Sequence, residues 1–262
     1  MNKNILATII VLAIGIGLLA GVHFLGSQDD KKPQAAQESL KPKEETAEGY
    51  KDLGNLYIKK KEYDKALECY NKALELDPEY PPAYNNIANV HFILGEFEKS
   101  IENYKLAIEK DPENADYYSS LGNAYSAIKD FDNAFKNYEK RIELTPDSFR
   151  DYYNIGFIHF VKEDYEKAIE YYEKAIKYNP KFVTAYDNLG IVYVKQQKFD
   201  KAIECFNKAI EINSRDYMAY MNLAAVYDQQ GKKEQALENF RKALKANPEV
   251  INNIPPEYQK EL

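Results

Sequence analysis

The sequence has few of the residues on which enzyme and metal sites are usually built. Its 262 residues include only two cysteines and three histidines, Cys69, Cys205, His23, His91 and His159. Two cysteines cannot form a disulfide framework, and a metal site needs clustered ligands, which histidines this far apart in the sequence do not indicate. The sequence also lacks a glycine-rich phosphate loop, a nucleophile elbow and an H-E-x-x-H motif. We therefore expect no catalytic residue, no metal and no cofactor, and we predict that the protein is not an enzyme.

An excess of basic charge is absent as well. The formal net charge is −7 at pH 7, and the lysines are scattered among acidic residues. A nucleic-acid partner requires a basic face that can neutralise phosphates. The charge pattern therefore argues against a nucleic-acid partner.

One long apolar run stands at the start of the chain. No residue from Ile5 to Leu25 carries a formal charge, and as a helix this run is about 31 Å long, enough to cross a bilayer. We predict a transmembrane anchor within residues 1–25, with the remainder of the chain outside the cytoplasm. The alternative is a signal peptide that is cleaved off, and the flanking lysines do not decide the orientation.

Two further features accompany the anchor. Ala13, Gly17 and Gly21 form a small-residue face that could pair two anchors into a homodimer, although small residues are common in membrane helices. Residues 26–46 are polar and include Pro33 and Pro42. This composition predicts a flexible linker that holds the next domain away from the bilayer.

The remainder of the chain repeats every 34 residues. Tyrosines recur on this grid without exception, small residues recur at two further positions, and a proline closes five of the six units. The members of these sets are Tyr50, Tyr84, Tyr118, Tyr152, Tyr186 and Tyr220; Gly54, Ala88, Gly122, Gly156, Gly190 and Ala224; Ala66, Ser100, Ala134, Ala168, Ala202 and Ala236; and Pro78, Pro112, Pro146, Pro180 and Pro248. The six units are residues 47–80, 81–114, 115–148, 149–182, 183–216 and 217–250.

Each unit contains the pattern of two amphipathic helices. In the first unit, apolar and small residues recur at helical spacing from Tyr50 to Tyr57 and again from Tyr63 to Leu74. Proline at Pro78 disfavours helix in the residue before it and ends the second helix. A glycine or alanine at the crossing lets the two backbones approach. One such hairpin cannot bury its apolar face alone, so neighbouring units must stack.

The pattern aromatic-x-x-[LI]-[GA]-x-x-[YH], followed by A-x-x-x-[YF]-x-x-A and a proline, resembles the tetratricopeptide repeat (TPR) family over residues 47–250. The resemblance implies an all-α fold, a right-handed α-solenoid of antiparallel helix pairs, which would follow the one N-terminal transmembrane helix that the apolar run predicts. His91 and His159 occupy a tyrosine position of the pattern, so we interpret them as packing residues.

Three departures from the pattern are informative. Arg141 stands where the other units have alanine, so we expect a wider junction between the third and fourth repeats. Lys233 replaces an aromatic residue, as suits a last repeat that meets water. Residues 251–262 are too short for another repeat, and we expect them to form a capping tail over the last apolar face.

In TPR proteins, the first helix of each repeat carries a stripe of side chains, separate from its core face. This stripe lines a concave groove that holds a peptide or a partner's helix. In repeats four to six this stripe is apolar, which favours an amphipathic helix or apolar peptide as the partner. Its predicted binding residues are Tyr153, Phe157, Phe160, Ile191, Met218 and Met221. The alternatives are that the solenoid closes over the stripe or that the tail fills it.

Two sharper hypotheses concern polar residues of the groove. Asn86, Asn154, Asn188 and Asn222 share one repeat position at which some TPR proteins hold a peptide backbone; the alternative is that they are solvated or locally bonded. Lys51, Asn55 and Asn86 match three places of the clamp with which some TPR domains bind a chaperone's terminal carboxylate. Asp116 and Ser120 occupy its two basic places, and the carboxylate of Asp116 would repel such a ligand.

These features predict a membrane-anchored scaffold that binds a protein or peptide segment without covalent chemistry and assists assembly of a multiprotein complex. Two other functions stay open: a targeting or chaperone receptor that faces the cytosol, and a regulatory subunit of an envelope or secretion enzyme complex. The fold alone does not choose among them.

Overall fold

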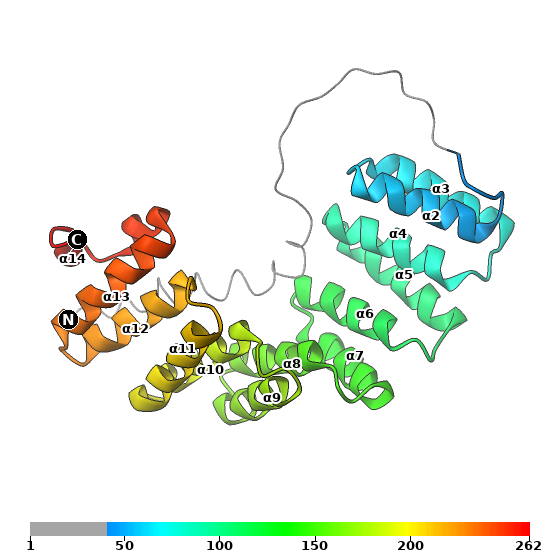
Figure 1. Cartoon of the computed structure of the whole chain (residues 1–262). Coiled ribbons are helices and arrows are strands. Elements are labelled where there is room, and N and C mark those ends of the chain that lie inside the picture. The colour runs from blue at the N-terminus through cyan, green and yellow to red at the C-terminus, as the bar shows by residue number, and fades with distance from the viewer. Residues whose placement is uncertain (1–40) are drawn as a thin grey trace, which may run out of the picture. The chain divides into compact units, whose positions relative to one another are not determined.

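A computed structural model describes residues 41–262 of the chain. Within this range the secondary structure is helical, and no strand occurs. The helices, labelled in Figure 1, are α2 (Ala47–Lys59), α3 (Tyr63–Leu76), α4 (Pro81–Ile93), α5 (Phe97–Lys110), α6 (Ala115–Ala127), α7 (Phe131–Leu144), α8 (Phe149–Val161), α9 (Tyr165–Tyr178), α10 (Val183–Lys195), α11 (Phe199–Ile212), α12 (Tyr217–Gln229), α13 (Lys233–Ala246), the 3₁₀ helix η1 (Pro248–Asn253) and α14 (Pro256–Gln259). The predicted anchor, its small-residue face and most of the linker lie outside the described residues.

The described residues divide into two compact units, which we describe separately. The amino-terminal unit, residues 41–146, contains α2 to α7, and the carboxy-terminal unit, residues 147–262, contains α8 to α14. In both units each odd-numbered helix from α3 to α13 packs most extensively against the helix before it. The structure therefore has a helix pair in each of the six 34-residue repeats, and the prediction of a repeat solenoid of paired helices is confirmed.

A tight contact between the two helices of a pair explains the small residues on the grid. A Cβ atom added to Gly54 would lie 2.4 Å from Cε1 of Tyr70, and one added to Gly122 would lie 2.6 Å from Cε1 of Tyr138. Real Cβ contacts are not this short, so glycine is what allows the tyrosine ring to lie directly on the helix backbone. The ring of Tyr70 is only 1% exposed as a result.

The turns between the two helices of each pair share one backbone conformation. The residue after the C-cap adopts a positive φ in each pair, 77° at Gly95 and 72° at Gly231. At the equivalent positions of the other four repeats a non-glycine residue has a φ between 59° and 62°: Lys61, Lys129, Glu163 and Gln197. This left-handed residue ends the first helix and turns the chain back along it.

The carboxyl terminus covers the last helix pair. Three side chains of the tail share one core with α12 and α13. They are Val250 of η1, which is 3% exposed, Ile254, which is 2% exposed, and Tyr258 of α14, which is 2% exposed. The ring of Tyr258 lies 4.9 Å from that of Phe240, and its hydroxyl donates a hydrogen bond to Asp228. The tail thereby buries an apolar face that would otherwise meet water.

Arg141 forms polar contacts within the amino-terminal unit. Its guanidinium donates to the backbone oxygen of Thr145 at 3.0 Å and to Oδ1 of Asp116 at 3.4 Å. These bonds give the Nη1 and Nη2 donors of the guanidinium acceptors, at a position where the other repeats have alanine. The wider junction expected at this place falls between the two units and stays a prediction.

Residues 41–262 contain neither a membrane-spanning helix nor a disulfide. None of the helices in this range combines the length and the apolar character that a membrane crossing needs. The thiols of Cys69 and Cys205 are both free and buried, in different units. Burial raises the pKa of the Cys205 thiol to about 12, which favours the protonated thiol over the reactive thiolate at neutral pH.

Candidate partner-binding stripe

The predicted binding residues of repeats four to six lie on the first helices of the carboxy-terminal unit. Helix α8 packs against α9, α10 against α9 and α11, and α12 against α11 and α13. The residues in question are Tyr153, Phe157 and Phe160 of α8, Ile191 of α10, and Met218 and Met221 of α12. We call these six residues the apolar stripe.

Most side chains of the stripe are buried. A groove that is open to a partner requires exposed side chains, yet five of the six are only 2–7% exposed, while Met218 is half-buried. Burial depends on which helices come together in space, and the helical period of a single sequence does not contain that information. The proposed role of the stripe in binding is a separate matter and stays a prediction.

Tyr153 shows why one of these side chains is buried. Its ring lies 5.6 Å from the ring of Tyr172 and 5.2 Å from that of Phe182. Its hydroxyl oxygen accepts a hydrogen bond of 2.8 Å from Nδ2 of Asn188, and burial raises the pKa of this hydroxyl. Tyr153 therefore links the fourth repeat to the fifth, in addition to any contact that it makes with a partner.

Four more residues of the stripe are buried, two of them against named neighbours. The ring of Phe160 lies 6.2 Å from that of Tyr165, and Met221 belongs to the core that contains Phe240 and the tail. Phe157 and Ile191 are 7% and 2% exposed. The stripe is thus continuous with the packing of the unit at both of its ends.

The four asparagines of the predicted amide ladder have different surroundings. Nδ2 of Asn86 donates to Oδ1 of Asn55 at 3.1 Å, and Nδ2 of Asn188 donates to Tyr153. Asn154 is half-buried. Asn222 is 4% exposed, and its Nδ2 has no hydrogen-bond partner. Local bonding thus accounts for Asn86 and Asn188, whereas Asn222 keeps a buried donor for which residues 41–262 supply no acceptor.

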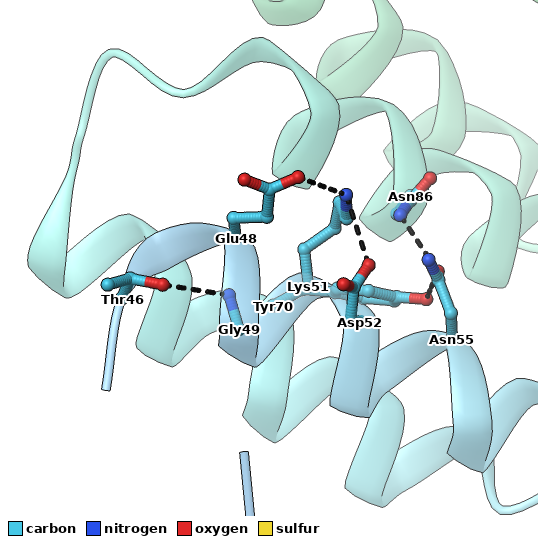
Figure 2. Close-up of polar contacts among 8 residues, drawn as sticks. All are labelled: Thr46, Glu48, Gly49, Lys51, Asp52, Asn55, Tyr70 and Asn86. Atoms are coloured by element: carbon cyan, nitrogen blue, oxygen red, sulfur yellow. Dashed lines mark hydrogen bonds and ion pairs between the residues drawn. The ribbon is translucent and has the colours of Figure 1, made fainter. Parts of the chain in front are cut away.

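A second asparagine position bonds to the partner helix in the amino-terminal unit. The hydroxyls of Tyr70, Tyr104 and Tyr138 donate to Oδ1 of the asparagine 15 residues before each of them, at 2.7, 2.6 and 2.8 Å. The acceptors are Asn55, Asn89 and Asn123. In Figure 2 the tyrosine hydroxyl and the Asn86 amide both point at Asn55. Each asparagine thereby satisfies the one polar atom of a buried tyrosine.

The residues that match the carboxylate clamp have local partners in the same view. Nζ of Lys51 lies 3.5 Å from Oε1 of Glu48 and 3.1 Å from Oδ1 of Asp52 (Figure 2). Two neighbouring carboxylates therefore already neutralise the lysine, and Asn55 is occupied by Tyr70 and Asn86. The three matching residues are thus bonded to neighbours within the first two repeats, and Asp116 and Ser120 do not supply the two basic side chains of the clamp.

Sequence reasoning missed a buried carboxyl group beside the stripe. Asp187 of α10 is 7% exposed, and its Oδ1 has no hydrogen-bond partner. Burial, together with the neighbouring carboxyl of Asp216, raises the pKa of Asp187 well above its ordinary value. The only sequence signal was an acidic residue among apolar stripe positions, and nothing in the sequence indicated its depth.

The two histidines of the described chain are packing residues with local partners. Nδ1 of His91 lies 2.6 Å from Oε2 of Glu96, and Nδ1 of His159 lies 3.3 Å from Oδ2 of Asp164. The ring of His159 stacks on that of Tyr171, and burial lowers its pKa. Within residues 41–262 no group of three or more histidine, cysteine or acidic side chains could hold a metal ion.

Comparison with solved structures finds helical repeat proteins. The crystal structure of MamA is 30% identical in sequence with a TM-score of 0.58, and the match covers 63% of this chain and 97% of MamA. The Pseudomonas aeruginosa protein PilF is 19% identical with a TM-score of 0.69, and the match covers 82% of this chain and 97% of PilF. YrrB, described as a TPR protein with an unusual peptide-binding site, is 24% identical with a TM-score of 0.56. This match covers 66% of this chain and 89% of YrrB. The last two show likeness of fold alone.

Comparison with sequence families gives the same result over most of the chain, although no curated protein matched it. A profile described as TPR repeat matches residues 54–94 and 88–129. Profiles described as tetratricopeptide repeat match residues 115–148, 150–182 and 181–249. Together with the paired helices and the similarity to MamA, these matches show that the chain belongs to the tetratricopeptide repeat family.

Proposed function

We propose that the protein is a membrane-anchored scaffold that binds a segment of another protein along the apolar stripe. The observation that carries this proposal is the composition of the stripe, which gathers aromatic and methionine side chains on three successive first helices. A groove for an apolar peptide or an amphipathic helix requires side chains of this kind. Holding such segments from one or several proteins would assist assembly of a multiprotein complex.

The chemistry of the described residues suits non-covalent binding. Burying one large apolar side chain against the stripe would contribute about 1.5–3 kcal/mol. The buried Nδ2 of Asn222 and Oδ1 of Asp187 are a donor and an acceptor that a bound peptide could satisfy. The peptide-binding site described for YrrB, which has a similar fold, is consistent with this use of the solenoid.

Membrane anchoring through residues 5–25 is part of the proposal. The uncharged run is long enough to span a bilayer, and the polar residues 26–46 would connect it to the first repeat. We place the repeats outside the cytoplasm. Both native thiols are buried, so a cysteine introduced at the exposed Lys181 is the better reporter of topology. Labelling of Lys181→Cys by an impermeant maleimide on intact cells supports this orientation, and labelling only after the cells are opened supports a cytosol-facing receptor.

The binding proposal is tested by crosslinking in intact cells, followed by affinity capture and mass spectrometry. A Phe157→Asp, Met221→Asp variant places two charges in the stripe and should lose the captured partner. An Ile93→Asp, Leu94→Asp variant is the control, because it adds the same charges at side chains that are 41% and 44% exposed in the other unit. Circular dichroism must show that both variants are folded. Equal capture by the wild type and both variants would show that the binding surface lies outside the stripe.

A further inference from the structure

One edge of the amino-terminal unit combines exposed apolar side chains with lysines. The edge lies where α2, α4 and α6 end and the chain turns into α3, α5 and α7. The turns have the same shape, because the N–H of Glu62, Glu96 and Asp130 donates to the carbonyl oxygen five residues earlier, at 2.9, 2.8 and 2.9 Å. Helix α4 packs on α2 and α3, and α6 packs on α5. The three turns therefore follow one another along one side of this unit.

Large apolar side chains are exposed at two of these turns. Ile93 at the end of α4 is 41% exposed, Leu94 after it is 44% exposed, and Ile128, which follows α6, is 38% exposed. The equivalent places of Ile93 and Leu94 in the fifth and sixth repeats are polar: Lys195, Gln196, Gln229 and Gln230. Packing of a repeat thus does not require apolar residues here, and exposed apolar groups of this kind mark an interaction surface.

Lysines flank this apolar group. They end α2 and follow α6, and all of them are exposed: Lys59, Lys60, Lys61 and Lys129. The acidic side chains of the turns each have a partner in their own repeat: Glu62 with Lys65, Glu96 with Lys99, and Asp130 with Asn133. The positive charge of the four lysines therefore faces solvent. We call these lysines, together with Ile93, Leu94 and Ile128, the turn edge.

We propose that the turn edge docks on a bilayer surface that contains anionic phospholipids. Apolar side chains beside lysines suit the membrane interface, where the apolar groups enter the boundary between headgroups and acyl chains and the lysines meet lipid phosphates. The inference goes beyond the proposed function and takes from it only the anchor, which keeps the amino-terminal unit close to a bilayer. Docking fixes the orientation of this unit on the membrane.

The chain ahead of the first repeat is long enough for this contact. Residues 26–46 join the apolar run to α2 and reach about 70 Å when extended, at 3.3–3.6 Å per residue. The helices of the amino-terminal unit have 13 or 14 residues, which is about 20 Å at 1.5 Å per residue. Either end of the helices can therefore turn toward the bilayer. Because the anchor keeps the edge near the surface, a weak affinity is sufficient.

Charge decides which end of the helices docks. The chain has a net charge of −7, so an anionic surface repels much of it. Charges in physiological salt act over only about 8 Å, so lipid headgroups at the turn edge sense its lysines more than acids on other faces. The opposite end of α3 is also apolar, since Leu76 is 52% exposed, but the exposed Glu75 and Asp77 adjoin it. Leu76 is therefore a matched control that anionic lipid should not bind.

The test uses the full chain reconstituted into vesicles, with the fluorophore NBD on one introduced cysteine. Both native thiols are buried, so the label goes to Ile93→Cys at the turn edge or, in a second protein, to Leu76→Cys. Residue 76 lies about 20 Å along its helix from the turn. The vesicles consist of phosphatidylcholine alone or of an equal mixture with phosphatidylglycerol. Doxyl-labelled lipid in each quenches an NBD group that touches the bilayer.

In the mixed vesicles we expect quenching at position 93 to be at least fivefold greater than at position 76. In phosphatidylcholine alone we expect little quenching at either position, because the lysines then lack an anionic partner. Emission at position 93 should shift to the blue together with the quenching, since NBD then leaves water for the lipid boundary. Raising the salt concentration should reverse both changes.

A pair of lysine substitutions separates charge recognition from general stickiness. Lys60→Gln with Lys61→Gln should lower the quenching at position 93 at least threefold. Glutamine occupies both places in the fifth repeat with the same backbone conformation, so the fold accepts it. Lys72→Gln with Lys140→Gln removes the same charge from exposed side chains on α3 and α7 and should leave the quenching unchanged.

Equal quenching at positions 93 and 76, or none at position 93 in the mixed vesicles, would overturn the inference. Equal quenching at position 93 in phosphatidylcholine alone would refute the requirement for anionic lipid. A blue shift without quenching would indicate a second copy over the edge and would also overturn the inference. Flotation with phosphatidylcholine vesicles tests the anchor separately. A chain that floats but is not quenched at position 93 keeps the anchor and loses this inference, and a chain that is quenched in mixed vesicles without floating shows the reverse.

Discussion

The hydroxyl of Tyr70 on α3 donates a hydrogen bond of 2.7 Å to Oδ1 of Asn55 on α2. The tyrosine ring lies on the backbone at Gly54 and is almost fully buried, so its hydroxyl needs an acceptor inside the helix pair. The same bond occurs in the next two repeats. A pair of side chains 15 residues apart thus joins the two helices of a repeat by packing and by a polar contact.

Tyr70→Phe should lower the free energy of unfolding by about 1 kcal/mol, because it removes one buried hydrogen bond and leaves Asn55 with Asn86 as its remaining partner. The midpoint of urea denaturation, followed by circular dichroism, measures this change. Tyr84→Phe is the matched control, since the Tyr84 hydroxyl bonds to the Pro78 carbonyl in an exposed position. Equal effects of the two substitutions would contradict the role given to Asn55.

Substitutions at Gly122 should show a graded cost. The second and sixth repeats have alanine at this position, at Ala88 and Ala224, and both alanines are fully buried. A helix pair can therefore shift enough to accept one methyl group, and Gly122→Ala should cost about 1 kcal/mol. Gly122→Val should cost about 3 kcal/mol, because a branched side chain cannot fit beneath the ring of Tyr138. Thermal unfolding of both variants measures the difference, and a valine variant as stable as the alanine variant would refute the tight crossing.

Asp187→Asn should make the protein more stable at pH 7.5 and equally stable near pH 4. The pKa of Asp187 is raised in the folded state, so the folded protein holds a proton that the unfolded chain releases as the pH rises above about 4. Stability of the wild type therefore falls as pH rises toward the folded-state pKa, and an amide at this position removes that loss.

Melting temperatures of wild type and Asp187→Asn between pH 4 and pH 8 test this sign. Asp200→Asn on α11 is the control, because Asp200 is exposed in the same unit. A stability difference that is constant across this range would show that the carboxyl of Asp187 does not titrate in the way its burial requires. A wild type that is the more stable protein at pH 7.5 would contradict the prediction outright.

Removal of the tail's aromatic ring should destabilise the carboxy-terminal unit. Tyr258→Ala deletes a ring that is 2% exposed and packs on Phe240, at an expected cost of about 3 kcal/mol. Tyr258→Phe keeps the ring and loses only the bond to Asp228, at about 1 kcal/mol. Chemical denaturation distinguishes the two. If the alanine variant unfolds at the wild-type midpoint, η1 and α14 add nothing to the stability of the last repeat.

The repeat architecture could be predicted from the sequence because its signals are local and occur six times. The 34-residue grid of tyrosines and small residues specifies a pair of helices, and the close approach at Gly54 and Gly122 is the physical cause of that grid. Proline after the second helix marks its end, as at Pro78, two residues beyond the last residue of α3. Each of these features depends only on residues within a single repeat.

The polar contacts and the burial of the stripe could not be predicted in the same way. Asp187 of α10 meets Asp216, the residue that caps the start of α12, only because α12 lies beside α10, and the helical spacing of the sequence does not encode that neighbour. Tyr153 has the spacing of a groove residue, yet its ring packs between Tyr172 and Phe182. Helical spacing predicts which face a side chain lies on, whereas its burial depends on what the fold brings over that face.

Photo-crosslinking in intact cells tests the use of the stripe most directly. A photo-reactive residue is placed at Met221 in the stripe and, in a second protein, at Ile93, which is 41% exposed in the other unit. If the stripe binds the partner, the residue at position 221 forms an adduct with another protein and the residue at position 93 does not. An adduct with another protein at position 93, with none at position 221, would show that partners bind elsewhere on the solenoid.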